Sequence, residues 1–129
     1  MEKLTKAEEP IMKILWDLQS AFVKDIVEQM PNPKPPYNTV SSIVRILVKK
    51  GFVNYKAYGK TYEYKPAISK TDYKKFELKN LKSSYFGNST RQLVSFLVEK
   101  EDLSKEEIEE IKKIIDQNTP KPWMQAWSI

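Results

Sequence analysis

The sequence predicts a mainly α-helical fold with one small β-hairpin. Three observations predict it. Apolar residues recur at three- and four-residue steps in six stretches of the chain, which is the period of a helix with one buried face. Small polar residues that cap helices precede several of these stretches. One stretch has the pattern of two strands joined by a Gly-Lys pair. With 129 residues, the chain is one domain of ordinary size or two very small ones.

The first helix is predicted over residues 5–18. Thr5 followed by Glu8 has the spacing of a capping box, which satisfies two backbone donors at a helix start. Pro10 falls within the first turn and a half, where few backbone hydrogen bonds are lost. The apolar face of this helix is expected to carry Ala7, Ile11, Ile14, Leu15 and Leu18.

Two further helices are predicted on either side of the proline-rich run 31–36. Ser20 is expected to cap the second helix, and the prolines end it because they disfavour helical geometry. Its inner face is expected to carry Val23, Ile26, Val27 and Met30. Asn38 or Thr39 is expected to cap the third helix, and Gly51 is a natural left-handed residue at its end. The buried face of the third helix is expected to carry Val40, Ile43, Val44 and Leu47.

A β-hairpin is predicted from residues 52–58 and 61–65. The two residues between the strands are Gly59 and Lys60, and a loop of this length with Gly first fits a type II′ turn. Side chains alternate between the two faces of a strand. One face of the first strand is expected to carry Val53, Tyr55 and Ala57, and the other Asn54, Lys56 and Tyr58.

Three more helices are predicted after residue 66. Their expected start residues are Ser69 or Thr71, then Ser89, then Ser104, which has capping-box spacing with Glu107. The last residues, 119–129, show no helical period. Trp123, Met124 and Trp127 in this tail are expected to cover an apolar groove of a dimer or to recruit a partner.

The composition excludes several kinds of chemistry. The chain has no Cys and no His, which removes thiol and imidazole nucleophiles, disulfides and nearly every metal site with N and S ligands. The acidic residues of 106–110 could form a catalytic carboxylate set. Glu109, however, lies three and four residues from Lys112 and Lys113, the spacing of exposed helix ion pairs, which indicates a solvated helix face. The N-terminus carries charges on both sides of its apolar residues, so we expect no signal peptide and no membrane insertion. We therefore expect a cytoplasmic protein that is not an enzyme and uses no cofactor or metal.

Positive charge is concentrated in the front half of the chain. Residues 1–65 carry 11 basic and 7 acidic side chains, whereas residues 83–129 carry 6 and 8. Residues 33–65 contain seven basic side chains and a single acidic side chain, that of Glu63. Such an excess favours a polyanion such as DNA as the partner. The alternative is a solvated surface with ordinary lysines.

The first three helices and the hairpin have the connectivity of a winged helix-turn-helix. In such proteins the N-terminal residues of the recognition helix contact base edges in the major groove, and the wing contacts the backbone. The predicted DNA-binding residues are Asn38, Thr39, Ser41, Ser42, Arg45 and Lys49 on the helix, and Lys56, Tyr58 and Lys60 on the hairpin. The alternative role of Asn38 and Thr39 is helix capping, and that of the hairpin residues is exposure to solvent.

Two domains are predicted, a winged-helix DNA-binding domain over 1–68 and a three-helix dimerisation region over 69–129. The second piece is too small to bury its large apolar side chains by itself, so we expect a two-fold homodimer. The predicted dimerisation residues are Phe76, Leu81, Leu93, Phe96, Leu97, Ile108, Ile111 and Ile115. The alternative is that these helices fold back on the first domain as one monomeric core.

The chain resembles the BlaI/MecI/CopY family of bacterial transcriptional repressors, the penicillinase repressors, over about residues 4–118. The matching motifs are LTKAEEPIMKILWD, NTVSSIVRILVKKGFV, KTYEYKP and FGNSTRQLVSFLVEKEDLSKEEIEEIKKII. The last motif is the most specific, because winged helices are common whereas this helical tail is not. The resemblance implies a homodimer that binds double-stranded, palindromic operator DNA and blocks transcription.

Three departures from the family pattern bear on the operator and on the inducing signal. Ser41 stands where the family often has a basic residue, and an arginine is displaced to Arg45, with Ile46 in its usual place. The lack of Cys excludes the copper-responsive branch. In β-lactam-responsive members a membrane-bound sensor protease triggers cleavage of an Asn-Phe bond. The cleavage position that the resemblance implies is Ser95-Phe96, which keeps the Phe and lacks the Asn, and relief of repression would come from such proteolysis or from dimer disruption.

The alternative function is a winged-helix module that binds protein within a larger assembly. Its wing and tail aromatics would form the docking surface. Affinity for random duplex DNA at low salt separates this function from DNA binding, since a DNA-binding domain has measurable non-specific affinity.

Overall fold

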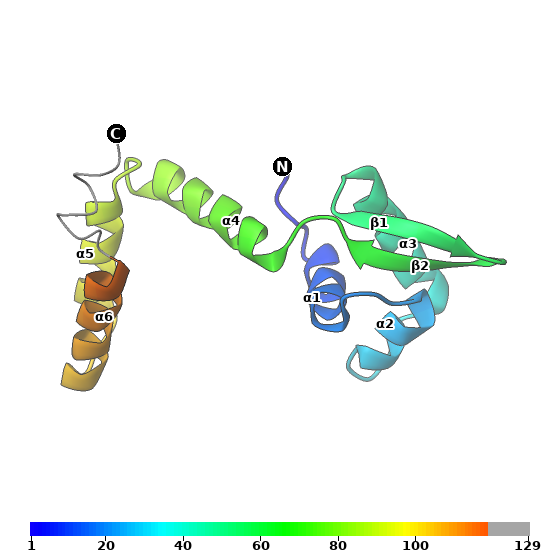
Figure 1. The fold of residues 1–129 in the computed structure, drawn as a ribbon, viewed down its shortest axis with the longest axis horizontal. Helices are drawn as coiled ribbons and strands as arrows, with labels where there is room; N and C mark the ends of the chain where they lie inside the picture. Colours follow the sequence, from blue (N-terminus) through cyan, green and yellow to red (C-terminus); the bar gives the residue numbers. More distant parts are fainter. Residues whose placement is uncertain (119–129) are drawn as a thin grey trace. The chain divides into compact units, whose positions relative to one another are not determined.

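The computed structural model describes residues 1–118, in two compact units (Figure 1). The first unit is Met1–Leu81 and the second begins at Lys82. Trp123, Met124 and Trp127 lie outside the described residues. The elements are α1 (Glu8–Leu18), α2 (Val23–Gln29), α3 (Tyr37–Lys49), β1 (Val53–Tyr58), β2 (Thr61–Pro66), α4 (Lys70–Tyr85), α5 (Thr90–Lys100) and α6 (Lys105–Asn118). This order confirms the predicted class, mainly α with one small antiparallel hairpin after the third helix.

The start of α1 confirms the predicted capping box. The Thr5 N–H donates to Glu8 Oε1 at 2.8 Å, and the Glu8 N–H donates to Thr5 Oγ1 at 3.2 Å. These two bonds satisfy donors that have no partner within the helix. The helix then buries Ile11, Met12 and Leu15 on the face that packs into the core.

The start of α2 differs from the prediction that Ser20 caps it. The helix begins at Val23, after Phe22, whose N–H donates to Asp25 Oδ2 at 3.0 Å. Ala21 forms a β-bridge with Tyr64, with N–H···O distances of 2.9 and 2.8 Å. This bridge holds the backbone before α2 in an extended form, so the helix cannot begin earlier.

The start of α3 also differs from the sequence prediction, because neither Asn38 nor Thr39 caps it. Pro36 precedes the helix in an extended conformation, and its carbonyl accepts from the N–H groups of Thr39 (3.1 Å) and Val40 (3.3 Å). The helix begins at Tyr37, and no side chain caps it. The prolines set this start because their fixed φ suits the entry to a helix. The side chains of Asn38 and Thr39 are therefore not used for capping.

The end of α3 confirms Gly51 as its left-handed residue, with φ +84°. The Gly51 N–H donates to the Val48 carbonyl at 3.1 Å, and the Phe52 N–H to the Leu47 carbonyl at 2.9 Å. These are the two hydrogen bonds of a Schellman motif. The reversal turns the fully buried Phe52 into the core and begins β1.

The hairpin is a two-stranded antiparallel sheet with a two-residue loop, as predicted. Its register runs from Val53 opposite Pro66 to Tyr58 opposite Thr61. Gly59 opens the loop at φ +58°, a conformation that glycine adopts without steric cost. The loop forms the tip of the wing.

The hydrophobic core belongs to the first unit. Its buried members are Leu4, Ile11, Met12, Leu15, Ala21, Val23, Ile26, Val40, Val44, Leu47, Phe52, Val53, Tyr64 and Tyr73. Tyr73 is the contribution of α4, and its ring lies 5.8 Å from that of Trp16 and 5.9 Å from that of Phe52. The domain boundary between residues 68 and 69 stays a prediction. The packing of Tyr73 joins the first turns of α4 to the first unit.

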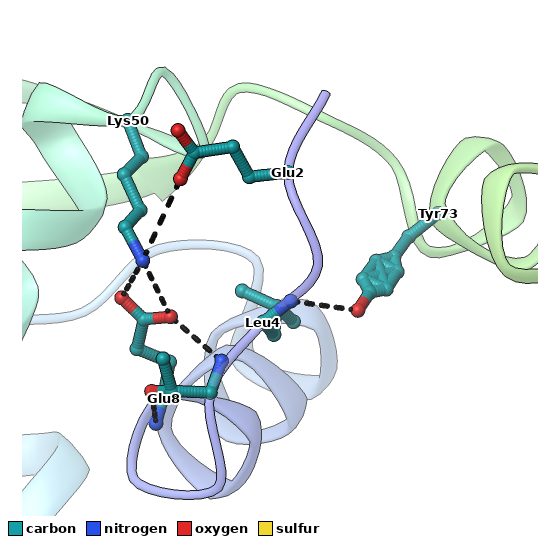
Figure 2. A network of polar contacts seen from close by, with 6 residues as sticks. Glu2, Leu4, Glu8, Lys50 and Tyr73 are labelled. Atoms are coloured by element: carbon teal, nitrogen blue, oxygen red, sulfur yellow. Dashed lines mark hydrogen bonds and ion pairs between the residues drawn. The ribbon is translucent and has the colours of Figure 1, made fainter.

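A polar network ties the N-terminal segment to α3 and α4 (Figure 2). The Leu4 N–H donates to the Tyr73 hydroxyl oxygen at 2.9 Å, and Lys50 Nζ lies 2.9 Å from Glu8 Oε2. Burial by itself would raise the pKa of the Glu8 carboxyl. Hydrogen bonds from Thr5 and Lys50 outweigh this effect and lower that pKa below its ordinary value.

The second unit contains α5 and α6, which begin as predicted. Ser89 Oγ accepts from the Gln92 N–H at 3.1 Å, and Ser104 and Glu107 form the second capping box with distances of 3.1 and 3.4 Å. Neither α5 nor α6 has a buried residue. Within residues 1–118, every helix is too short or too polar to cross a bilayer.

Candidate nucleic-acid interface

The exposed face of α3 carries most of the polar residues that the sequence predicts to contact DNA. Val40, Val44 and Leu47 are buried on the opposite face. One row of exposed side chains runs along the helix at steps of four, three and four residues. This row, the α3 row, consists of Asn38, Ser42, Arg45 and Lys49. Such a surface presents donors and acceptors of the kind that read base edges.

The α3 row has free hydrogen-bonding capacity. In the described part of the chain, the Asn38 side-chain amide makes no hydrogen bond, so its donor and acceptor both remain available. Ser42 Oγ donates to the Asn38 carbonyl at 2.9 Å, which leaves its oxygen as an acceptor. Of the other predicted residues, Thr39 is exposed and Ser41 is half-buried at the edge of a groove.

A groove of about 380 Å³ opens beside α3. Residues of α3, of the wing and of the start of α2 line it, together with Phe22, the residue before α2. Its lining residues are Phe22, Val23, Lys24, Tyr37, Asn38, Ser41, Arg45, Lys60, Thr61, Tyr62 and Tyr64. Lys24, Arg45 and Lys60 supply three positive charges, and no carboxylate lines the groove. We call this surface the cationic groove.

Exposed tyrosines adjoin Arg45 on this side of the protein. Tyr37, Tyr55 and Tyr62 are 54%, 58% and 46% exposed, so their hydroxyls can reach a ligand. Tyr55 and Tyr62 pack edge to face, with ring centroids 5.3 Å apart. With Arg45, Val48 and Tyr64, they line a smaller cavity of about 240 Å³.

Among the lining residues of the cationic groove that the sequence prediction missed are Lys24, Tyr37 and Tyr62. Tyr37 could have been found from its place directly before Asn38. The mixture of aromatic and basic residues in the wing was a weaker signal for Tyr62. Lys24 had no signal, because only the folded chain brings the start of α2 beside α3.

The positive charges of residues 33–65 divide into two groups. Lys34 Nζ donates to backbone carbonyls at the end of α2, at 2.8 and 2.9 Å, and Lys50 pairs with two carboxylates at 2.9 and 3.8 Å. By contrast, Arg45, Lys49 and Lys60 form no ion pair within residues 1–118. Burial raises the pKa of the Tyr64 hydroxyl, and the positive charge of Arg45 opposes that rise. The unpaired charges are those that face outward from α3 and the wing.

The remaining predicted wing residues lie on the other face of β1 from Tyr55. The Lys56 ammonium stands 5.4 Å from the centre of the Tyr58 ring, and that ring lies 6.0 Å from the ring of Phe22. Both residues remain exposed. The structure therefore brings Lys60, but neither Lys56 nor Tyr58, into the lining of the cationic groove.

The predicted dimerisation residues fall in both units. Phe76 and Leu81 belong to the first unit, where Phe76 is half-buried and its ring lies 6.0 Å from that of Tyr73. The others lie on α5 and α6: Leu93, Phe96, Leu97, Ile108, Ile111 and Ile115. Leu93 and Ile111 are half-buried and the rest of this group is exposed.

The pair Ser95 and Phe96 lies in the middle of α5, and both side chains are exposed. The ring of Phe96 contacts that of Phe86, with centroids 5.4 Å apart. Because Ser95 and Phe96 both lie within α5, the peptide bond between Ser95 and Phe96 has helical geometry, and the helix around it is exposed.

The carboxylates of α6 form no metal site. Glu109 and Lys112 lie 3.5 Å apart on the exposed surface, as expected for a solvated helix face. In the described part of the chain, no group of carboxylates is arranged to hold a metal ion.

Comparison with known proteins relates the chain to bacterial repressors. The family model for the penicillinase repressor matches residues 4–117. The methicillin resistance regulatory protein MecI of Staphylococcus aureus (strain N315) is 31% identical over 115 residues, which cover 88% of this chain and 94% of MecI. The penicillinase repressor of Bacillus licheniformis is 24% identical over 121 residues, covering 90% and 91%.

One solved structure that the comparison matches to this chain is the solution structure of the Bacillus licheniformis BlaI monomeric form in complex with the blaP half-operator. It covers 56% of this chain and 89% of its own, with 25% identity and a TM-score of 0.47.

Proposed function

The chain belongs to the penicillinase repressor family, and from this we propose that it is a transcriptional repressor that binds a palindromic operator as a homodimer. The observation that carries the proposal is the α3 row beside the cationic groove. The row keeps unused donors or acceptors within residues 1–118, and the groove offers positive charge with no carboxylate in its lining. The protein would act in the cytoplasm by occluding the promoter.

The α3 row would read the operator from the major groove. Asn38 can bond adenine through its amide, and Arg45 can bond guanine through its guanidinium. Ser42 would accept a hydrogen bond, because its own hydrogen is donated to a backbone carbonyl. Lys49, at the last turn of α3, and Lys60, at the tip of the wing, would contact phosphates. Thr39, Ser41, Lys56 and Tyr58 are exposed or half-buried nearby and remain proposed contacts.

The exposed apolar side chains of α5 and α6 support a homodimer. Large apolar side chains on these helices, including Phe96, Leu97 and Ile115, are about half exposed, and neither helix has a buried residue. Two helices of this size cannot form a core without added surface. A two-fold dimer would supply that surface and would place two recognition helices on successive major grooves, about one helical turn or more apart.

Repression would be relieved when the dimer is lost. Cleavage between Ser95 and Phe96 would divide α5 and remove part of the apolar surface, and a membrane-bound sensor protease pathway is the proposed trigger. Dimer disruption without cleavage would have the same effect, because two linked half-site contacts bind far more tightly than one.

The test is selection of bound duplexes from a random pool, followed by affinity measurements on the winning sequence at several salt concentrations. We expect a palindrome. With about six or more phosphates contacted, affinity should fall by about a thousandfold between 50 and 200 mM salt. A protein without affinity for random duplex at low salt would instead be the protein-binding module considered above.

A further inference from the structure

We propose that the cationic groove seats one sugar-phosphate strand of the operator, with Lys24 and Tyr62 as phosphate contacts. This inference rests on the proposed function and extends it to residues outside α3 and the wing tip. In a duplex, one backbone strand separates each major groove from the adjacent minor groove. A protein with its recognition helix in the major groove and its wing beside it must therefore span that strand.

The position of the groove fits this strand. Residues of α3 and of β2 line it together, and Arg45 belongs to the same lining. A strand in the groove would thus pass beside the recognition helix while that helix reads base edges.

The chemistry of the groove fits a phosphodiester. Three cations line it without a carboxylate, and none of Lys24, Arg45 and Lys60 forms an ion pair within residues 1–118. Tyr62 adds an exposed hydroxyl that can donate to a phosphate oxygen. Lys24 stands one residue after the start of α2, so its contact would fix α2 on the DNA as well as α3.

Substitutions of Lys24 and Tyr62 should have different effects on the affinity for DNA and on its salt dependence. Lys24→Met removes one charge, so the slope of log affinity against log salt should fall by about 0.9, and affinity at 0.1 M salt should fall by about eightfold. Tyr62→Phe removes a neutral donor and keeps the ring. It should weaken binding by about three- to tenfold and leave the salt slope unchanged. Because phosphate contacts carry no sequence information, both losses should be the same on operator and on random duplex.

Matched variants complete the test. Lys24→Arg should retain the wild-type slope, and Lys13→Met, which removes an exposed charge from α1 outside the groove, should change neither slope nor affinity. Melting curves would establish that each variant is folded. Ethylation interference on the wild-type complex should place the sensitive phosphates on the DNA strand that separates the major groove from the adjacent minor groove.

The failure of this inference can be distinguished from the failure of the proposed function. If the wild type binds a palindrome while Lys24→Met and Tyr62→Phe bind with unchanged affinity and slope, the groove does not hold the strand. If the wild type itself binds no duplex, the proposed function fails first.

Discussion

The buried pair between Lys50 and Glu8 allows a quantitative test of the fold. The Glu8 side chain is 4% exposed and accepts from Lys50 at 2.9 Å and from the Thr5 N–H at 2.8 Å. Lys50→Met keeps most of the aliphatic stem and leaves the carboxylate buried without its cation. Removing one partner of a buried pair costs about 3–5 kcal/mol. Since Lys50 is 23% exposed and the Thr5 bond remains, we expect about 2–3 kcal/mol.

The pH dependence of this loss follows from the Glu8 pKa. Its folded value is lowered from 4.5, because the hydrogen bonds outweigh the effect of burial. A lowered folded pKa means that the pair stabilises the protein fully above 4.5, and that this contribution is lost as the pH falls through the lower, folded value. The difference between wild type and Lys50→Met should therefore be largest near pH 7 and smallest at about pH 3.

The assay is thermal and urea unfolding followed by circular dichroism at both pH values. For a unit of this size, a loss of 2–3 kcal/mol corresponds to a Tm lower by roughly 10–20 °C. Lys49→Met is the matched control, because Lys49 is the adjacent residue, is exposed and has no ion pair in the described part of the chain. Equal melting of the two variants at pH 7, or a difference that persists unchanged at pH 3, would refute the reasoning.

Three further predictions concern recognition, the α3 terminus and assembly. Arg45→Ala should weaken operator binding by about 1–3 kcal/mol if the side chain reads a base, and random duplex much less; equal losses in a filter-binding titration would make it a phosphate contact. Gly51→Ala should cost about 1–2 kcal/mol in urea unfolding, because φ is +84° while the added methyl has open space, and Gly51→Asn should cost less. Leu97→Asp should shift the protein from dimer to monomer in sedimentation, with exposed Ser95→Asp as the control; an unchanged dimer would exclude Leu97 from the interface.

The sequence by itself determined the order of the helices and strands and several of their termini. The capping boxes at Thr5 and Ser104, the Schellman glycine Gly51 and the two-residue hairpin loop all formed as predicted. These features rest on hydrogen bonds between residues a few positions apart, so the local sequence specifies them. The exposed row on α3 followed in the same way from helical periodicity.

The tertiary structure decided the start of α2 and the use of each charge. The bridge from Ala21 to Tyr64 set the start of α2 at Val23 and not at the position that the local sequence indicates. Lys50 pairs with Glu8, which is 42 residues away in the sequence, and the fold places Lys24 beside α3. The residues next to Lys50 and Lys24 in the sequence do not indicate these positions, because both depend on which surfaces meet when the hydrophobic core forms.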